Sequence, residues 1–219
     1  MRSSKDLTNK LNDSFIELDI SSEQQTSLIN TLNFIRNKSE ETWQHSVGVG
    51  VTGKEVGQYM NFIAPKALFY FGLLHDTGKA LTDPNSLDKK EGFDHNDKRE
   101  LSKHPIDGYR ILRGVHDASA KVALLHHSFQ GKRSYPKSLP KMHIEISNES
   151  DLLITYAARI IGLIDFYDAA TFRENDRYSP GNPRLPSNKE VKTDLIKCNP
   201  DQDHLIHCLY DEGIFGRQD

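Results

Sequence analysis

The sequence is poor in cysteine, has no excess of basic residues and contains no long apolar run. Its two cysteines, Cys198 and Cys208, lack the spacing of a zinc knuckle, so we expect free thiols in a reducing compartment. A net charge of −3 provides no broad basic field, which argues against duplex DNA or RNA as a main partner. No apolar stretch is long enough to span a bilayer, and the N-terminus lacks an apolar signal core. We therefore expect a cytoplasmic protein that does not enter membranes.

The chain also lacks segments in which apolar and polar residues alternate, as they do in half-buried strands, and it contains no internal repeat. Its 219 residues, of which 36% are apolar, suffice for one compact domain. Apolar residues recur at helical spacing along most of the chain, which predicts an all-α fold: a helical bundle with long loops and little or no strand. We expect a main domain over residues 39–219 and an N-terminal helical segment over residues 1–38 that packs on its core.

The expected helices are marked by capping residues, glycines and prolines. Glycines between Gly48 and Gly57 indicate that the second helix packs closely against another helix. Pro65 fits the first turn of a third helix, which is apolar nearly all round and therefore central. We expect loops at 82–99, where the loop could fold over a site, and at 131–148. The expected helices cover 21–35, 39 to at least 56, 65–79, 97–112 with an interruption at His104-Pro105, 117–129, 150–174, and short segments after a capping box at 187–190.

An apolar run from Phe69 to Leu74 leads directly into His75, Asp76 and Lys79. Polar groups are costly at the end of such a run unless something pairs with them, and a metal ion would do so. A His-Asp pair by itself is also typical of an exposed helix end, here with Gly78 as the C-cap. The metal interpretation is favoured because other acids and histidines also interrupt or flank apolar helical segments: Glu41, His45, His104, His126, His127 and Asp165.

The spacing of these residues favours more than one metal ion. Adjacent residues on a helix point about 100° apart. His75 and Asp76 therefore suit two neighbouring ions, bridged by the carboxylate, better than they suit one ion. His126 and His127 show the same adjacency.

Two further positions have ordinary alternatives. Glu41 and His45 lie four residues apart, so both can reach one ion from one face of a helix; alone, they would be a surface ion pair. Asp165 interrupts an apolar stretch, where its alternatives are a buried hydrogen bond or a protonated acid. The other histidines have no comparable setting, and we expect them at the surface: His95, His116, His143, His204 and His207.

The order of these residues resembles the HD superfamily of metal-dependent phosphohydrolases, and specifically its HD-GYP branch. The similarity extends over residues 41–178. It rests on Leu-Leu-His-Asp-Thr-Gly-Lys at 73–79, His-Pro-Ile-Asp-Gly-Tyr-Arg-Ile-Leu at 104–112, the doubled histidine at 126–127, and Asp-Phe-Tyr-Asp-Ala-Ala at 165–170. The resemblance implies a helical HD domain that hydrolyses cyclic di-GMP, or a related cyclic dinucleotide used in signalling, with two or three iron or manganese ions.

The sequence departs from this branch in the segment that gives the branch its name. The branch has the pattern His-His-Glu-x-x-Asp-Gly-x-Gly-Tyr-Pro, whereas residues 126–136 read His-His-Ser-Phe-Gln-Gly-Lys-Arg-Ser-Tyr-Pro. The two histidines are kept, but the acids and both glycines are changed. Ser134 lacks the freedom of glycine to adopt a positive φ, so we expect the loop backbone to take another path.

Imidazole and carboxylate ligands without thiolate suit iron, manganese or zinc. Two ions bridged by a carboxylate would activate a water for in-line attack on phosphorus. We expect Glu41 to reach a third ion or to orient a ligand. At least two ions are predicted to bind through His45, His75, Asp76, His104, His126, His127 and Asp165.

Cations near this centre are candidates for binding phosphate. Lys79 lies one turn from His75 and would neutralise the charge that develops on the phosphate oxygens. Arg133 could hold a second phosphate. The resemblance implies the same role for Arg177, with Arg173 as a rival.

Three functions are consistent with these residues. The first is a metal-dependent phosphodiesterase that acts on a cyclic dinucleotide. The second is another HD-type hydrolase, of nucleoside phosphates or phosphomonoesters, and the third is a metal-bound module without turnover that senses a nucleotide or docks a partner. Because the ligands are kept while the loop has changed, we expect phosphodiester hydrolysis with a specificity that has moved away from cyclic di-GMP.

Overall fold

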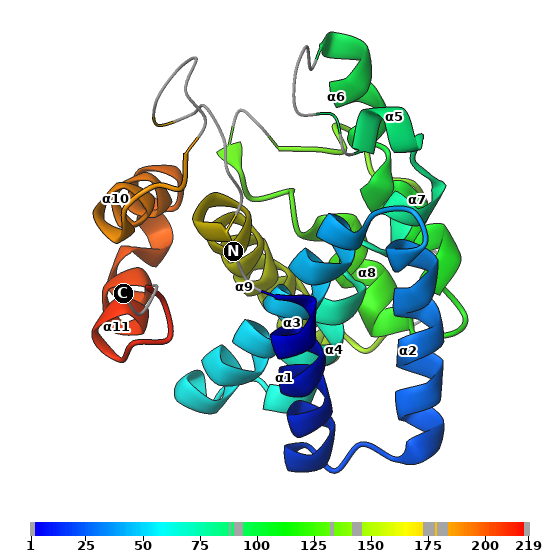
Figure 1. The fold of residues 1–219 in the computed structure, drawn as a ribbon, viewed down its shortest axis with the longest axis horizontal. Helices are drawn as coiled ribbons and strands as arrows, with labels where there is room; N and C mark the ends of the chain where they lie inside the picture. Colours follow the sequence, from blue (N-terminus) through cyan, green and yellow to red (C-terminus); the bar gives the residue numbers. More distant parts are fainter. Residues whose placement is uncertain are drawn as a thin grey trace.

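The computed structural model is built of helices, and the residues it describes form no sheet (Figure 1). These residues are 3–87, 89, 94–131, 134–141, 146–172, 178 and 184–216. The first half contains α1 (Ser4–Glu17), α2 (Ser22–Arg36), α3 (Glu40–Met60), α4 (Pro65–Leu74), the 3-10 helix η1 (Thr77–Leu81), α5 (Pro84–Leu87) and α6 (His95–Leu101). The second half contains α7 (His104–Leu112), α8 (Asp117–Leu125), α9 (Asn148–Phe172), α10 (Asn188–Cys198), the 3-10 helix η3 (Pro200–Gln202) and α11 (Asp203–Asp211). The predicted all-α class is confirmed.

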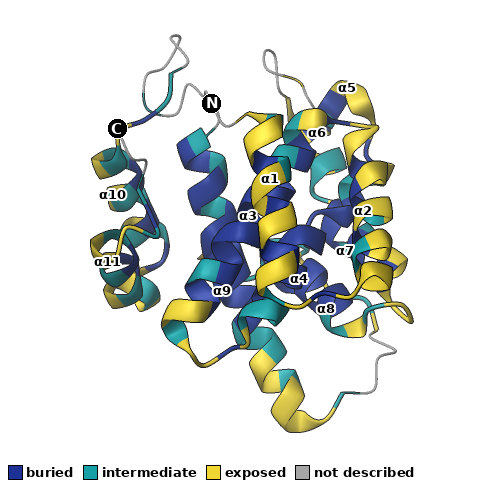
Figure 2. Ribbon diagram, turned by 60° about the horizontal axis from the view of Figure 1, so that its bottom comes forward, coloured by how far each residue is buried: buried dark blue, intermediate teal, exposed yellow. Residues whose placement is uncertain are grey.

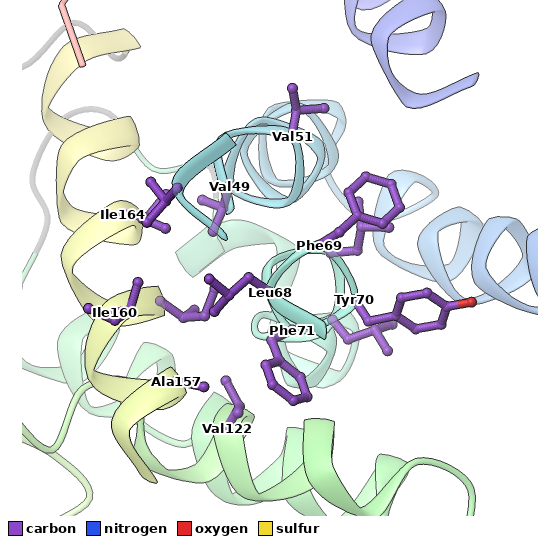
Figure 3. Close-up of a cluster of buried hydrophobic side chains, with 14 of the residues drawn as sticks. Val49, Val51, Leu68, Phe69, Tyr70, Phe71, Val122, Ala157, Ile160 and Ile164 are labelled. Carbon is purple, nitrogen blue, oxygen red and sulfur yellow. The ribbon is translucent and has the colours of Figure 1, made fainter. Parts of the chain in front are cut away.

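Helices α3, α4, α8 and α9 enclose the centre of the hydrophobic core. Val49 of α3, Leu68 of α4, Val122 of α8 and Ile160 of α9 are each 0% exposed. Figure 3 shows these side chains converging on α4, which lies between the other helices. A helix that is apolar nearly all round is buried on every side, as was expected of the segment that begins at Pro65.

Glycines let α3 and α4 pack with their backbones in contact. A Cβ atom built on Gly72 would lie 2.7 Å from the Cα atom of Gly50, and one built on Gly53 would lie 2.8 Å from the carbonyl oxygen of Leu68. Real Cβ atoms essentially never come this close, so a side chain at either position would force the helices apart. The close packing predicted from these glycines is confirmed.

The remaining helices cover this core. Helices α1 and α2 both contact α3, while α10 contacts α9. Figure 2 shows exposed outer faces on α1 and α2 and a largely buried α3 behind them. On α1, the Phe15 ring meets Phe69 of α4 edge-on, with 5.9 Å between the ring centroids. The division into residues 1–38 and 39–219 remains a prediction.

Several predicted boundaries were wrong. Helix α1 precedes the first expected helix, and α5 and α6 occupy part of the expected loop at 82–99. The helix from Pro65 was expected to reach Lys79 but ends at Leu74, where the His75 ring and the Thr77 hydroxyl bond to the carbonyl oxygens of Gly72 and Leu74. Helix α8 likewise ends at Leu125, before the expected Phe129. The capping box at Ser187 and Glu190 is confirmed.

The two cysteines, Cys198 and Cys208, are free thiols, as expected. Among the described residues, no helix combines the length and the apolar character that crossing a membrane requires.

Candidate metal centre

Seven of the predicted ligand residues meet inside the bundle, although they come from five separate parts of the chain. His45 lies within α3, His75 and Asp76 form the turn after α4, and Asp165 lies within α9. The other three are at helix ends: His104 begins α7, and His126 and His127 follow α8. All seven are buried, with at most 7% of any residue exposed: His45, His75, Asp76, His104, His126, His127 and Asp165.

Three of the histidines are oriented by the same local hydrogen bond. The Nδ1 atom of His75 lies 2.7 Å from the carbonyl oxygen of Gly72, three residues earlier. The same contact is made by His104 to Leu101, at 2.6 Å, and by His126 to Ala123, at 2.8 Å. A carbonyl only accepts, so Nδ1 must carry the proton in each case. Each Nε2 atom is then left as the atom that can bind a metal.

Two glycines bring the backbones of these ligands close to neighbouring elements. A Cβ atom on Gly78 would lie 2.0 Å from the carbonyl oxygen of His104, and one on Gly162 would lie 2.1 Å from that of His126. No side chain fits at either position in this arrangement. The two glycines therefore allow η1 to approach α7, and α9 to approach the end of α8.

The histidines and Asp76 form two groups of possible ligands. In each group, one donor atom from each residue lies within 4.8 Å of the others. These groups are His45, His75 and Asp76, and His104, His126 and His127.

The carboxylate of Asp76 lies between the two groups. Its Oδ2 atom is 3.6 Å from His45 Nε2 and 3.3 Å from His75 Nε2. Its Oδ1 atom is 3.2 Å from His104 Nε2 and 4.0 Å from His126 Nε2. One oxygen thus faces each group, which is the arrangement expected of a carboxylate that bridges two ions.

Asp165 joins the same two groups from α9. Its Oδ1 atom is 3.0 Å from His45 Nε2 and 3.8 Å from His75 Nε2, whereas its Oδ2 atom is 3.7 Å from His127 Nδ1. The sequence analysis predicted Asp165 as a ligand. It did not predict that Asp165, like Asp76, would lie between the two groups.

The electrostatics keep most of these groups in the protonation state that a metal requires. Burial lowers the pKa of His104 to about 3 and that of His126 to about 4. Burial opposes the ionisation of Asp76 and Asp165, but neighbouring histidines, together with Lys79 in the case of Asp76, outweigh it and hold both pKa values well below the usual range. His75 is an exception among the histidines with a shifted pKa. Burial lowers its pKa, but the attraction of Asp76 outweighs burial, so the pKa of His75 is raised and its charged form is favoured.

Two buried atoms at the centre have no hydrogen-bond partner: Nε2 of His75 and Oδ1 of Asp76. Leaving such atoms unpaired costs free energy, and divalent cations would satisfy both. The donor set of imidazole nitrogens and carboxylate oxygens suits iron, manganese or zinc. The residues present therefore fit a centre for divalent transition metals.

Four residues extend the site beyond the ligands. Lys79, predicted from the sequence, pairs with Asp76 through a contact of 2.5 Å between Nζ and Oδ2. Three others were not predicted as site residues. Asp168 contacts His45, Gln130 lies 2.9 Å from the Nδ1 atom of His127, and the Tyr135 ring stacks on His127 with a centroid distance of 4.2 Å. The signal for Asp168 was its place three residues after Asp165, on the same face of a helix.

The remaining predictions concern residues that lie outside the described ranges or outside the two ligand groups. Arg133, Arg173, Arg177 and His143 lie outside the described residues. Glu41 is half-buried at the start of α3, and neither ligand group found among the described residues includes it.

Of the histidines expected at the surface, His95, His204 and His207 are exposed. The expectation for His116 was wrong. Its Nδ1 atom accepts from the Ser119 amide and so caps α8, and its ring stacks on Tyr70.

Comparison with known proteins identifies the family. Residues 42–170 match the HD domain, and this segment contains the seven predicted ligands that meet in the bundle but not Glu41. The chain belongs to the HD domain family. Both groups of possible metal ligands lie inside the matched segment.

One curated HD relative matches over 145 residues with 29% identity. It is the 3′3′-cGAMP-specific phosphodiesterase 1 of Vibrio cholerae serotype O1 (strain ATCC 39315 / El Tor Inaba N16961). The match covers 64% of this chain and 31% of that protein, so the HD chain described here corresponds to about a third of its relative.

Proposed function

We propose that this HD domain is a phosphodiesterase that hydrolyses a cyclic dinucleotide and is related to the HD-GYP branch. The observation that carries the proposal is the pair of carboxylates, Asp76 and Asp165, each with one oxygen toward each group of histidines. Two neighbouring divalent ions can bind both the attacking and the leaving oxygen of an in-line displacement at phosphorus. The named substrate of the relative, 3′3′-cGAMP, supports a cyclic dinucleotide.

In this proposal the chain's own residues hold and neutralise charge. Iron or manganese, with zinc as an alternative, would polarise the phosphate and activate water. His45, His75 and Asp76 would hold one ion, while His104, His126 and His127 would hold the other. Asp165 would join the two positions.

Lys79 is proposed to act on the phosphate. Its side chain is 13% exposed and pairs with Asp76, so its ammonium group lies beside the carboxylate that faces both ligand groups. With metal held at Asp76, the charge of this carboxylate would be shared, and the ammonium group of Lys79 would neutralise negative charge on the oxygens of a bound phosphate. Arg133 and Arg177 remain proposed contacts for a second phosphate.

The altered loop supports a specificity different from that for cyclic di-GMP. Ser134 is not among the described residues with positive φ, although Gly131 is, with a φ of 58°. Tyr135 follows Ser134 and stacks on His127, so this loop reaches the ligand group at α8. We propose that the loop shapes the substrate side of the centre and that its changes alter which dinucleotide fits.

The proposal is tested by metal analysis followed by turnover. Protein loaded separately with manganese, iron and zinc is assayed on bis(p-nitrophenyl) phosphate, 3′3′-cGAMP, cyclic di-GMP, nucleoside monophosphates and nucleoside triphosphates. We expect at least two ions per chain, hydrolysis of the generic diester, and slower cleavage of cyclic di-GMP than of another cyclic dinucleotide. Selective turnover of a mononucleotide would indicate a different HD hydrolase. Metal binding without turnover would indicate a module that senses or docks.

Two variants assign roles in the same assay. Lys79→Met should lower kcat by about 10²–10³-fold while the bound metal is unchanged, as expected for loss of a charge that acts in the transition state. Glu41→Gln should lower the metal content from three ions to two, or lower turnover at unchanged content, if Glu41 acts as proposed. Wild-type values in both variants would remove these residues from the mechanism.

A further inference from the structure

His45 differs from three of the other histidines at the metal centre in the partner of its Nδ1 atom. His75, His104 and His126 each direct Nδ1 to a backbone carbonyl of their own helix or turn. The Nδ1 atom of His45 instead lies 2.9 Å from the Oδ2 atom of Asp168, which is 123 residues away in the sequence. The contact therefore joins α3 to α9.

The reason for the difference is the position of His45 within a helix. The other three histidines lie at helix ends, where a ring can bend back to a nearby carbonyl oxygen. His45 is the sixth residue of α3, where the carbonyls accept from amides of the helix itself. The partner must then come from another element, and α9 supplies it.

Two carboxylates of α9 hold the His45 ring from both sides. Asp165 and Asp168 are three residues apart and so lie on one face of the helix. Asp165 Oδ1 lies 3.0 Å from Nε2 of His45, while Asp168 Oδ2 lies at Nδ1. Only the Nε2 side also faces Asp76, at 3.6 Å from its Oδ2 atom. The metal side of the ring is therefore Nε2, and Asp168 is on the opposite side.

Asp168 is 2% exposed, so it is a buried acid whose place beside a ligand calls for a reason. A carboxylate only accepts hydrogen bonds, so the contact with Asp168 places a proton on Nδ1 of His45. The contact of Nε2 with Asp165 would also need a proton, but an ion bound between them would take the place of that proton. Nε2 is then free of its proton whenever the imidazole is neutral, as metal binding requires. A charged acceptor also makes the imidazole a stronger donor of electrons to the ion than a neutral carbonyl would.

We propose that Asp168 is a positioning residue of the metal centre: it fixes the tautomer and the ring orientation of His45, so that Nε2 faces the ion shared with Asp76 and Asp165. This inference rests on the proposed metal centre and adds to it a residue that need not touch the ion. It also assigns two roles to one face of α9, since Asp165 faces the ligand groups and Asp168 orients a ligand.

The first test compares Asp168→Asn with a matched control. The control is Asp201→Asn, which removes an acid that pairs with Arg159 of α9, through contacts of 3.1 and 2.8 Å, away from His45. The affinity of metal-free protein for Mn²⁺ and Zn²⁺ is measured by titration. The urea midpoint of the metal-free form shows whether each variant is folded and how stable it is. We expect Asp168→Asn to bind one ion about 10–100-fold more weakly. We expect Asp201→Asn to bind Mn²⁺ and Zn²⁺ with the affinity and stoichiometry of the wild type.

The second test uses the wild-type protein, so its result does not depend on whether a variant folds. Nitrogen-15 NMR of the histidine rings in the Zn²⁺-loaded wild type reports which nitrogen of His45 carries the proton, because Zn²⁺ has no unpaired electrons. We expect a proton on Nδ1 of His45 and a metal-bound Nε2. A proton on Nε2 would overturn the proposal, and so would equal affinity in Asp168→Asn and wild type. Absence of metal from the wild type would overturn the metal centre as well, which distinguishes the two failures.

Discussion

At the scale of single residues, two glycines allow close packing at two histidines of the candidate metal centre. Gly78 allows η1 to approach the carbonyl of His104, and Gly162 allows α9 to approach the carbonyl of His126. Both contacts are with backbone atoms, which cannot rotate away as a flexible side chain can. Glycine is therefore required at these positions for close approach rather than for an unusual φ.

We predict that Gly162→Ala destabilises the protein and disturbs the group at His126. Alanine gains about 1 kcal/mol of helix propensity over glycine, but its Cβ would lie 2.1 Å from the His126 carbonyl oxygen. Overpacking of this kind costs about 1–3 kcal/mol, occasionally more. The urea midpoint should fall and the affinity for metal should drop. Gly108→Ala provides the milder comparison, because its Cβ would lie 3.2 Å from the Ala123 side chain and 3.3 Å from the Gly78 amide nitrogen, against 2.1 Å at Gly162. An equal effect in both variants would contradict the argument.

The buried histidines should also make the metal-free protein sensitive to acid. In the unfolded chain they take up protons near pH 6.5, whereas burial lowers the folded-state pKa of His104 to about 3, of His126 to about 4, and of His127 well below the usual value. Between these values the unfolded state binds more protons, so the free energy of unfolding falls as the pH falls. His75 has the opposite effect on the free energy of unfolding. Its pKa is raised in the folded state, so the stability that it contributes is lost as the pH rises.

With three histidines against one, we expect the urea midpoint of chelator-treated protein to be lower at pH 5 than at pH 7. The lowered pKa values of Asp76 and Asp165 extend the loss to more acidic pH. A midpoint that is unchanged or higher at pH 5 would show that these histidines are solvated or already protonated in the folded state.

At the scale of elements, helix α1 shows what the sequence pattern could and could not provide. Leu7, Leu11 and Phe15 recur every four residues and are all buried, so the helical signal was present. It was missed because the surrounding residues are mostly polar. Helix α5 was missed for the same reason, whereas α6 was expected only from residue 97, because it begins at a capping box between Asp94 and Asp97 rather than at apolar spacing.

We predict that α1 contributes to stability without taking part in the metal centre. Phe15→Ala removes a ring that is 2% exposed and packs edge-on against Phe69, which should cost about 3–5 kcal/mol in the free energy of unfolding. Its neighbour Ile16 is 77% exposed, so Ile16→Ala should change the urea midpoint little. Both variants should bind metal as the wild type does under conditions in which they are folded. Equal midpoints for the two variants would mean that α1 does not pack as described.

At the scale of the whole molecule, the sequence could indicate which residues form the centre but not how they are arranged. The pattern of polar residues in apolar helices identified seven residues that meet, because burial of such groups needs a shared cause. The pairing of His45 with Asp168 could not be read in the same way, because it depends on how α3 and α9 cross. That crossing follows from packing between residues more than 100 positions apart, which no local pattern encodes.

The same long-range arrangement leads to a prediction about the whole fold. The seven residues that meet at the centre come from α3, α9 and the ends of α4, α7 and α8, so ions bound in the two groups would together connect five helices. A ligand that binds only the folded state at 100 times its Kd adds about 2.7 kcal/mol to stability. In a chain of this size each kcal/mol corresponds to about 2–4 °C. We therefore expect Mn²⁺ to raise the Tm of chelator-treated protein by roughly 5–10 °C. In His126→Ala the rise should be smaller, whereas in His204→Ala, which changes an exposed histidine of α11, it should be that of the wild type. A wild-type Tm that does not respond to manganese, iron or zinc would show that the buried histidines and acids form a polar core without a metal.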